Sequence, residues 1–213
     1  MGAGRGIGLE LAKLLSQTHA VTATSRRPSP ALTALDVSHV TGVDICDRAA
    51  LGAVAARFDS ASLDLLIVVA GVLHRDTLGS IDDSQIQVQL DVNALGPVRV
   101  VDVFSDRLRD GAKVVVLTSR MGSMADNSSG GYYGYRMSKA ALNAAAVSLA
   151  HDLSHRKIAV GILHPGYVQT DMTGGNGDLS PAASAQLLVA RISELSLVQS
   201  GKFFHANGEG LPW

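Results

Sequence analysis

The sequence predicts an α/β fold in which one parallel β-sheet is covered by helices on both faces, giving three layers. Short β-branched runs alternate with longer stretches that are rich in alanine and leucine. Several of the short runs are apolar at almost every position, which is typical of strands buried on both faces. The chain has 213 residues, of which 46% are hydrophobic, so it can bury one sizeable core. Residues 1–213 contain no internal repeat or linker and are expected to form one domain.

The first half of the chain is predicted to contain two helices and three strands. Residues 6–18 carry leucines at helical spacing, and Asp47 is a typical N-cap for a helix over residues 47–58. The runs around these helices are short and contain the β-branched residues that strands favour. The predicted strands are residues 20–24, 42–45 and 65–69.

The second half is predicted to contain three helices and three strands. Residues 82–108 have helical character, but Gly96-Pro97 lies near their centre. Because proline has no N–H to donate within a helix, we expect a bend there. The other helices are predicted from alanine- and leucine-rich stretches, and the strands from apolar β-branched runs. The helices are residues 135–154 and 182–195, and the strands are residues 113–118, 158–163 and 202–205.

Tyr135 and Lys139 are four residues apart, so they lie on one face of the predicted helix. A free phenol has a pKa of roughly 10, and a nearby ammonium lowers that pKa because it favours the phenolate. Such a tyrosine can donate a proton to a carbonyl oxygen or accept one from an alcohol. Ser119 ends a predicted strand, and ligands in open α/β sheets bind at the carboxyl ends of strands. We therefore expect Ser119, with Ser123 as the alternative, beside Tyr135; an incidental surface pair is the competing interpretation.

A glycine-rich turn, Gly2-Ala3-Gly4-Arg5-Gly6-Ile7-Gly8, leads directly into the first predicted helix. Glycines let a backbone approach a pyrophosphate closely, and a helix N-terminus favours negative charge. A nucleotide-binding βαβ unit needs a strand before this turn, and in the doubly wound order that strand is central. We therefore expect a gap of roughly 10 Å in the sheet and interpret the sequence as an N-terminally shortened version of a longer chain.

Together these motifs resemble the short-chain dehydrogenase/reductase family, from Gly2 to the C-terminus. The resemblance implies a Rossmann-type doubly wound sheet, here lacking its first, central strand. His164-Pro165-Gly166 and the ending Leu211-Pro212-Trp213 are similar to the subgroup that contains the bacterial C-factor and small carbonyl reductases. The catalytic residues that the resemblance implies are Asn93, Ser119, Tyr135 and Lys139.

The resemblance also implies a nicotinamide dinucleotide cofactor. The glycine turn would receive the pyrophosphate, Asp44-Ile45 the adenine, and the segment from Pro165 to Thr170 the nicotinamide. One departure is Val68-Val69-Ala70-Gly71, where the family has Asn-Asn-Ala-Gly, so the hydrogen bonds of the asparagines are lost. The implied cofactor-binding residues are Gly2, Arg5, Gly6, Ile7, Gly8, Arg26, Asp44, Ile45, Ala70, Gly71, Tyr135, Lys139, Pro165, Gly166, Val168 and Thr170.

The charges after the second strand of this fold predict NADP(H) in preference to NAD(H). Enzymes of this fold that use NAD place an acidic residue there, on the ribose 2′-hydroxyl. This chain has Ser25-Arg26-Arg27 instead, and arginine pairs with a 2′-phosphate through charge-assisted hydrogen bonds. Arg5 is a second candidate for that contact. The competing interpretation is that these arginines are solvated surface charges.

The resemblance implies hydride transfer between the cofactor and a small carbonyl or alcohol substrate. Tyr135 would be the general acid or base, Lys139 would lower the phenol pKa and hold the ribose, and Ser119 would polarise the carbonyl oxygen. Asn93 would anchor a water that leads protons to Lys139, or would only interrupt its helix. Family members usually pair through the helices that carry Asn93 and Tyr135, so a homodimer or homotetramer is expected. The alternative function is a nucleotide-binding signalling or scaffold protein with little turnover.

Composition argues against several other classes of protein. The formal net charge is -1 without a basic block, so we expect no nucleic acid partner. The longest apolar run, residues 65–73, is too short to span a bilayer, so we expect no membrane insertion. Cys46 has no partner for a disulfide, which fits a reducing cytoplasm. His151 and His155 have the spacing of metal ligands but lack an identifiable third ligand, so no metal is expected.

Overall fold

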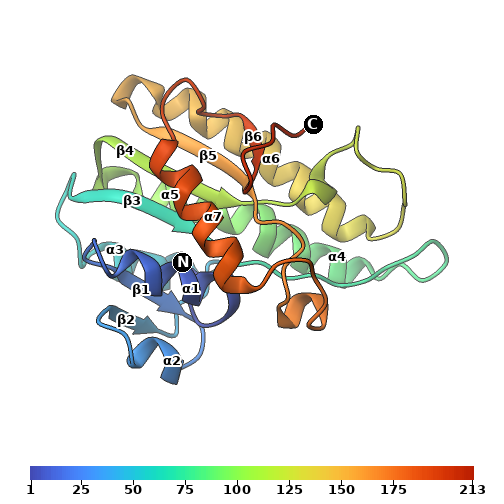
Figure 1. Ribbon diagram of the computed structural model, residues 1–213, viewed down its shortest axis with the longest axis horizontal. Helices are drawn as coiled ribbons and strands as arrows, with labels where there is room; N and C mark the ends of the chain where they lie inside the picture. The colour runs from blue at the N-terminus through green and yellow to red at the C-terminus, as the bar shows by residue number, and fades with distance from the viewer.

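The protein is a layered α/β structure in which neighbouring strands run parallel (Figure 1). The computed structural model describes residues 1–213. The strands are β1 (Thr22–Ser25), β2 (Ser38–Thr41), β3 (Leu63–Val68), β4 (Leu108–Leu117), β5 (Ala159–His164) and β6 (Phe203–His205). The helices are α1 (Gly6–Leu15), α2 (Pro30–Thr33), α3 (Arg48–Ala55), α4 (Asp83–Leu90), α5 (Gly96–Phe104), α6 (Tyr133–Leu153) and α7 (Pro181–Glu194).

Two helical layers enclose the sheet. Helices α1 and α7 pack together on one face, and α3, α5 and α6 cover the other; Figure 1 shows α7 in front of the sheet and α5 behind it. The central strand β4 serves both layers, because successive side chains of a strand point to opposite faces. Val114 and Val116 join the core beneath α5 and α6, whereas Val115 joins the core beneath α7. Burial on both faces explains why this strand is apolar throughout.

The sheet is interrupted between β1 and β3. Strand β1 pairs only with β2, while β3, β4, β5 and β6 form a separate four-stranded sheet. The N-terminus lies between the two parts (Figure 1), where Met1 N donates to Ile67 O at 2.6 Å and Ala3 N donates to Thr24 O at 2.8 Å. The strand order is therefore doubly wound, as predicted, with the gap at the central position.

Two short elements near the edge of the sheet differ from the prediction. The strand predicted over residues 42–45 is wrong: the partner of β1 is β2, which ends before Gly42, whose φ is +76°. Strand β2 reads Ser-His-Val-Thr and is largely accessible to solvent, so it does not carry the apolar run of a buried strand. Helix α2 was not predicted, although Ser29 caps it and Pro30 occupies its first position, which together are a start signal.

The helical region predicted over residues 82–108 consists of α4, a π-helical turn and α5. The turn spans Asp91–Leu95 and widens the helix one turn before the bend expected at Gly96-Pro97. Such turns occur as single insertions within helices, often at functional sites. Here the turn directs Asn93 inward, where its side chain is fully buried. None of the helices combines the length and the apolar composition needed to cross a membrane.

Candidate active site

The serine, tyrosine and lysine predicted to be catalytic come together at the carboxyl end of β4. Ser119 follows this strand, and its hydroxyl, which accepts from Met121 N at 3.1 Å, lies near enough to the phenol of Tyr135 to lower the phenol pKa. Tyr135 and Lys139 lie on the buried side of α6, and Lys139 Nζ is 5.9 Å from the centroid of the Tyr135 ring. The same ammonium donates to Leu117 O at 2.9 Å. One strand end and one helical turn therefore position all three side chains.

Burial controls the acidity of the two titratable groups. Tyr135 is 7% exposed, and loss of solvation raises its pKa to about 12, although the nearby hydroxyl of Ser119 acts in the opposite direction. Desolvation likewise lowers the pKa of Lys139 to about 8. The expectation that Lys139 lowers the phenol pKa is wrong for this structure. The ammonium is bound to the Leu117 carbonyl, and burial of the phenol dominates its pKa.

Asn93 joins the loop after β3 to the catalytic helix. Its Oδ1 accepts from Val72 N at 2.8 Å, and its Nδ2 donates to Val72 O at 2.8 Å and to Ser138 Oγ at 3.0 Å. Ser138 Oγ in turn donates to Tyr135 O at 2.8 Å. The side-chain amide is therefore engaged on both sides, and these contacts favour a role in holding the two elements together.

Asp76, which the sequence did not single out, anchors the start of the catalytic helix. Its carboxylate accepts from Tyr133 N and from Gly134 N, and its backbone oxygen accepts from Tyr132 N at 2.9 Å. Tyr132 has a φ of +53°, a left-handed conformation that costs a non-glycine residue of order 1–3 kcal/mol. Asp76 is buried in a loop 57 residues upstream of Tyr133, and only its burial distinguishes it from the surface aspartates.

The glycine turn is closely packed against the loop after β3. A Cβ on Gly2 would lie 2.7 Å from Ala70 N, and one on Gly8 would lie 2.3 Å from Gly2 O. Only glycine fits at these two positions. Gly6 has a φ of +54° and faces Thr170, whose Cγ2 would be 3.4 Å from an added Cβ. The structure thus brings together the glycine turn, Ala70 and Thr170, as predicted for a common binding surface.

The N-terminus of α1 has no capping side chain. Arg5 occupies the N-cap position, and its guanidinium reaches across to the carboxylate of Asp171 at 2.5 Å. By contrast, Asp47 caps α3 and Asp82 caps α4 through their side chains. Helix α1 therefore presents uncapped N–H groups and a positive dipole end, which is the ordinary arrangement for binding an anion.

The residues expected near the adenine and the 2′-phosphate differ in their exposure and in their contacts. Arg26 lies at the carboxyl end of β1, exposed, with Nη1 3.9 Å from Asp44 Oδ2. Asp44 also accepts from Cys46 N at 2.9 Å, so it caps a turn as well. Ile45 is 4% exposed and packs against Gly96 of α5. Its side chain contributes to the core, and the contact of Ile45 with the adenine stays a prediction.

The loops after β3 and β5 border the catalytic group. A Cβ on Gly71 would lie 3.2 Å from Asn93 Oδ1 and 3.7 Å from Lys139 Nζ, so the absence of a side chain keeps the surface beside the lysine open. After β5, Gly166 has a φ of +92°, and Pro165 O accepts from Ser184 Oγ at 2.7 Å. This segment continues through buried Val168 to Thr170, where a hydrogen-bonded turn with Thr173 fixes it.

Two further side chains complete the surroundings of the site. Ser123, the alternative hydroxyl, accepts from Asp126 N at 3.1 Å and is buried, so it stabilises a turn. His164, at the end of β5, lies edge-to-face with His205, their ring centroids 5.0 Å apart. Burial, together with the charges of His205, Arg120 and Lys139, lowers the pKa of His164 to about 3, so it is neutral near pH 7.

Comparison with known proteins places this geometry in context. The sequence pattern of the family described as short chain dehydrogenase matches residues 1–179. The chain is 37% identical over 220 residues to 1-hydroxy-2-glutathionyl-2-methyl-3-butene dehydrogenase of Rhodococcus sp. strain AD45, covering 100% of this chain and 97% of that protein. It is 43% identical over 154 residues to the C-signal protein of Myxococcus xanthus, covering 71% of this chain and 93% of that protein.

Solved structures show the same architecture. The carbonyl reductase Sniffer of D. melanogaster superposes with a TM-score of 0.92 at 26% identity, covering 100% of this chain and 97% of that one. The NADPH-bound carbonyl reductase from chicken fatty liver superposes with a TM-score of 0.90 at 28% identity, covering 100% and 96%. The likeness extends over the whole sheet and both helical layers.

Proposed function

The chain belongs to the short-chain dehydrogenase/reductase family, and from that premise we propose that it is an NADP(H)-dependent oxidoreductase that interconverts a carbonyl and an alcohol, with Tyr135 as general acid and base. The observation that carries the proposal is the buried group of Ser119, Tyr135 and Lys139 at the carboxyl end of β4. This is the edge of an open α/β sheet at which ligands bind.

The residues present fit a nicotinamide dinucleotide. Helix α1 leaves its N-terminus free for a pyrophosphate, and Gly71 keeps open the surface beside Lys139. Arg26 at the end of β1 favours a 2′-phosphate, and the structure of the chicken relative contains NADPH. When bound, the dinucleotide supplies or accepts the hydride. The other proposed contacts are those of the glycine turn, Ala70, Thr170 and the segment that begins at Pro165.

The titration of Tyr135 suits the reduction of a carbonyl. With a pKa of about 12 the phenol is protonated at neutral pH, so it holds the proton that the carbonyl oxygen must receive. Lys139, with a pKa of about 8, is then mostly cationic, and its ammonium is held beside the phenol by Leu117 O. Ser119 donates to the substrate carbonyl oxygen, and Asn93 holds the helix that carries Tyr135. Oxidation of an alcohol requires the phenolate and is therefore favoured at high pH.

Substitution of Tyr135 tests the proposal. Y135F should lower kcat for carbonyl reduction by about 10²–10⁴-fold, since the proton donor is removed. NADPH affinity and the unfolding temperature should be retained, because the ring remains. The matched control is Y133F, a neighbour two residues earlier on the helix and 36% exposed, which should have near-normal activity. The measurement is NADPH consumption with a panel of aldehydes and ketones. Near-normal activity of Y135F would refute the assignment, and binding of NADPH without turnover in the unmodified protein would favour a signalling role.

The assembly and location follow as further proposals. We propose a homodimer or homotetramer, supported by the exposed apolar side chains of Val88 and Leu95 on α4 and the π-helical turn. Light scattering during size-exclusion chromatography measures the mass, and a single species at 22.1 kDa would contradict this proposal. We place the protein in the cytoplasm, which is supported by Cys46, the lone cysteine, being a free thiol.

A further inference from the structure

The turn that carries Ser119 has little regular structure of its own. A single 3₁₀ turn, Arg120–Gly122, follows the serine, and α6 begins only at Tyr133. Between them, residues 123–132 form neither helix nor strand and are exposed at most positions. The hydroxyl of Ser119 accepts from Met121 N at 3.1 Å, so the direction of this hydroxyl depends on where the turn lies.

Gly122 fixes one side of the turn against α6. A Cβ on Gly122 would lie 2.8 Å from the carbonyl carbon of Lys139 and 3.0 Å from Ala140 N. Both are backbone atoms within a helix, which cannot move aside, so this close approach requires glycine. The turn therefore lies directly on the helix at Lys139.

The C-terminal segment, residues 203–213, lies on the other side of the turn. After β6 the chain reverses direction and returns along the outer edge of this strand, where Phe204 and Gly210 form an antiparallel bridge. Because β6 is the last strand of the four-stranded sheet, the returning chain covers an edge that would otherwise be open. Figure 1 shows the C-terminus close to β6.

Two contacts join the C-terminal segment to the turn. Trp213 O accepts from Ala125 N at 2.9 Å, and Arg120 Nη2 donates to Glu209 Oε2 at 3.2 Å. The indole of Trp213 stacks on Phe203 with the ring centroids 5.5 Å apart, which holds Trp213 on β6. The turn after Ser119 is therefore attached to the edge of the sheet through residues that lie far away in the sequence.

The guanidinium of Arg120 fixes the residue that directly follows Ser119. Besides the bond to Glu209, its Nε lies 3.2 Å from Asp126 Oδ2. A guanidinium is a rigid planar group, so carboxylates at two of its nitrogens restrict its orientation. These side chains are 38–56% exposed, and ion pairs of this kind contribute little to global stability. Their effect is therefore expected on the position of the turn.

We propose that the C-terminal segment is a brace for the turn that carries Ser119, and that Arg120 and Glu209 are positioning residues for the Ser119 hydroxyl. The proposal rests on the proposed function, in which this hydroxyl donates to the substrate carbonyl oxygen. A misplacement of a reacting group by about 1 Å can lower a rate by about 10²-fold, so a small shift of the turn is sufficient. Arg120 and Glu209 act on the reaction only through the turn.

Removal of both carboxylates from Arg120 tests the positioning role. The variant D126N/E209Q should lower kcat for carbonyl reduction by about tenfold and leave KM for NADPH within about twofold. The matched control, D64N/E194Q, removes two carboxylates that pair with other arginines, in β3 and at the end of α7, and should leave kcat unchanged. Both variants should keep Tm within about 4 °C of the unmodified protein, because exposed ion pairs contribute little to stability. Equal kcat values for the two variants would overturn the proposal.

Amide hydrogen exchange tests the brace without turnover. The amide of Met121 donates to the Ser119 hydroxyl and that of Ala125 donates to Trp213 O, so both report the position of the turn. In D126N/E209Q these two amides should exchange at least about tenfold faster than in the control variant. Unchanged exchange would overturn the proposal even if kcat fell, since the loss would then not come from the turn. An unmodified protein that reduces no carbonyl would refute the proposed function, whereas the brace would still be decided by the exchange rates.

Discussion

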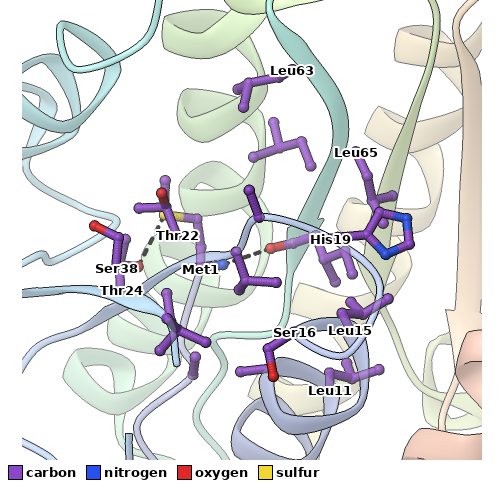
Figure 2. A pocket seen from close by; sticks show the side chains of 18 of the residues that line it. Met1, Leu11, Leu15, Ser16, His19, Thr22, Thr24, Ser38, Leu63 and Leu65 are labelled. Atoms are coloured by element: carbon purple, nitrogen blue, oxygen red, sulfur yellow. Dashed lines mark hydrogen bonds between the residues drawn. The ribbon is translucent and has the colours of Figure 1, made fainter. Parts of the chain in front are cut away.

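The four-stranded part of the sheet, β3–β6, is continuous and covered by helices on both faces, whereas the β1–β2 pair is joined to it only at one end, through three backbone hydrogen bonds of Met1 and Ala3. The first part carries Ser119 and the helix of Tyr135 and Lys139. The second carries the end of β1, beside which the glycine turn packs. The difference teaches that the proposed proton-transfer group is built into a closed core. The surface proposed for the dinucleotide lies across the gap between β1 and β3, a slot of about 850 Å³ (Figure 2). The two parts should therefore differ in local stability.

The two parts should differ most in the free energy of unfolding that is lost when a leucine is truncated. Leu142 of α6 is fully buried against the four-stranded sheet, so L142A should lower the free energy of unfolding by about 2–5 kcal/mol. Leu15 of α1 lines the slot, where removal of its side chain enlarges a space that is already open. L15A should therefore cost less than about 1 kcal/mol. Urea denaturation measures both, and equal losses would show that the slot is packed like the core.

The pH dependence of stability should report on the slot. The Met1 amine has its pKa lowered from 8.0 to about 6 in the folded protein. Between pH 6 and pH 8 the unfolded chain therefore binds more protons, so stability rises with pH by up to about 3 kcal/mol. The buried Lys139 gives a similar rise only above pH 8, up to the ordinary lysine value. N-terminal acetylation should abolish the lower rise. An acetylated protein with an unchanged profile between pH 6 and pH 8 would contradict this prediction.

The role of Asp76 in anchoring the start of α6 can be tested by comparison with Asp82, an ordinary N-cap of α4. D76A removes the carboxylate that accepts from Tyr133 N and Gly134 N, so it should lower stability by about 1–2 kcal/mol and kcat by about tenfold. The matched control is D82A, which removes an exposed cap from α4 and should leave kcat unchanged. Kinetics and thermal unfolding are measured on both. If the two variants lose kcat equally, or not at all, Asp76 has no special effect on Tyr135.

The smallest effect is expected on the affinity for the dinucleotide. R26A should weaken NADPH binding by about tenfold, since one charge-assisted contact with the 2′-phosphate is lost, and should leave NADH binding unchanged. R27A, the adjacent arginine, is the control and should change neither. Isothermal titration with the two dinucleotides measures all four affinities. A parallel loss for NADPH and NADH in R26A would assign Arg26 to general attraction rather than to the phosphate.

Most of the four-stranded part, β3–β6, was predictable from the sequence. Buried strands such as β4 have continuous apolar runs, and the spacing of Tyr135 and Lys139 places both on one helical face. Strand β2 was misplaced because an accessible edge strand carries no such run. Asp76 was missed because an aspartate in a loop has the same sequence signal whether it is exposed or holds a helix.

Properties that depend on tertiary burial were not predictable. The direction of the Tyr135 pKa shift depends on how much solvent reaches the phenol, which spacing along a helix does not reveal. The Arg5–Asp171 ion pair joins residues 166 positions apart, so the partner of the arginine in the glycine turn could not be read from its neighbours. Asn93 was expected near the bend, but its double contact with Val72 depends on the fold of the following loop.

The open edges of β1 and β3 have a consequence for handling the protein. Two unpaired strand edges are templates for strand addition by other chains, and exposed edges promote aggregation. Molecules in which these edges are exposed will therefore recruit one another as their concentration rises. The yield of dispersed material after expression then becomes a simple indicator of how well these edges are protected.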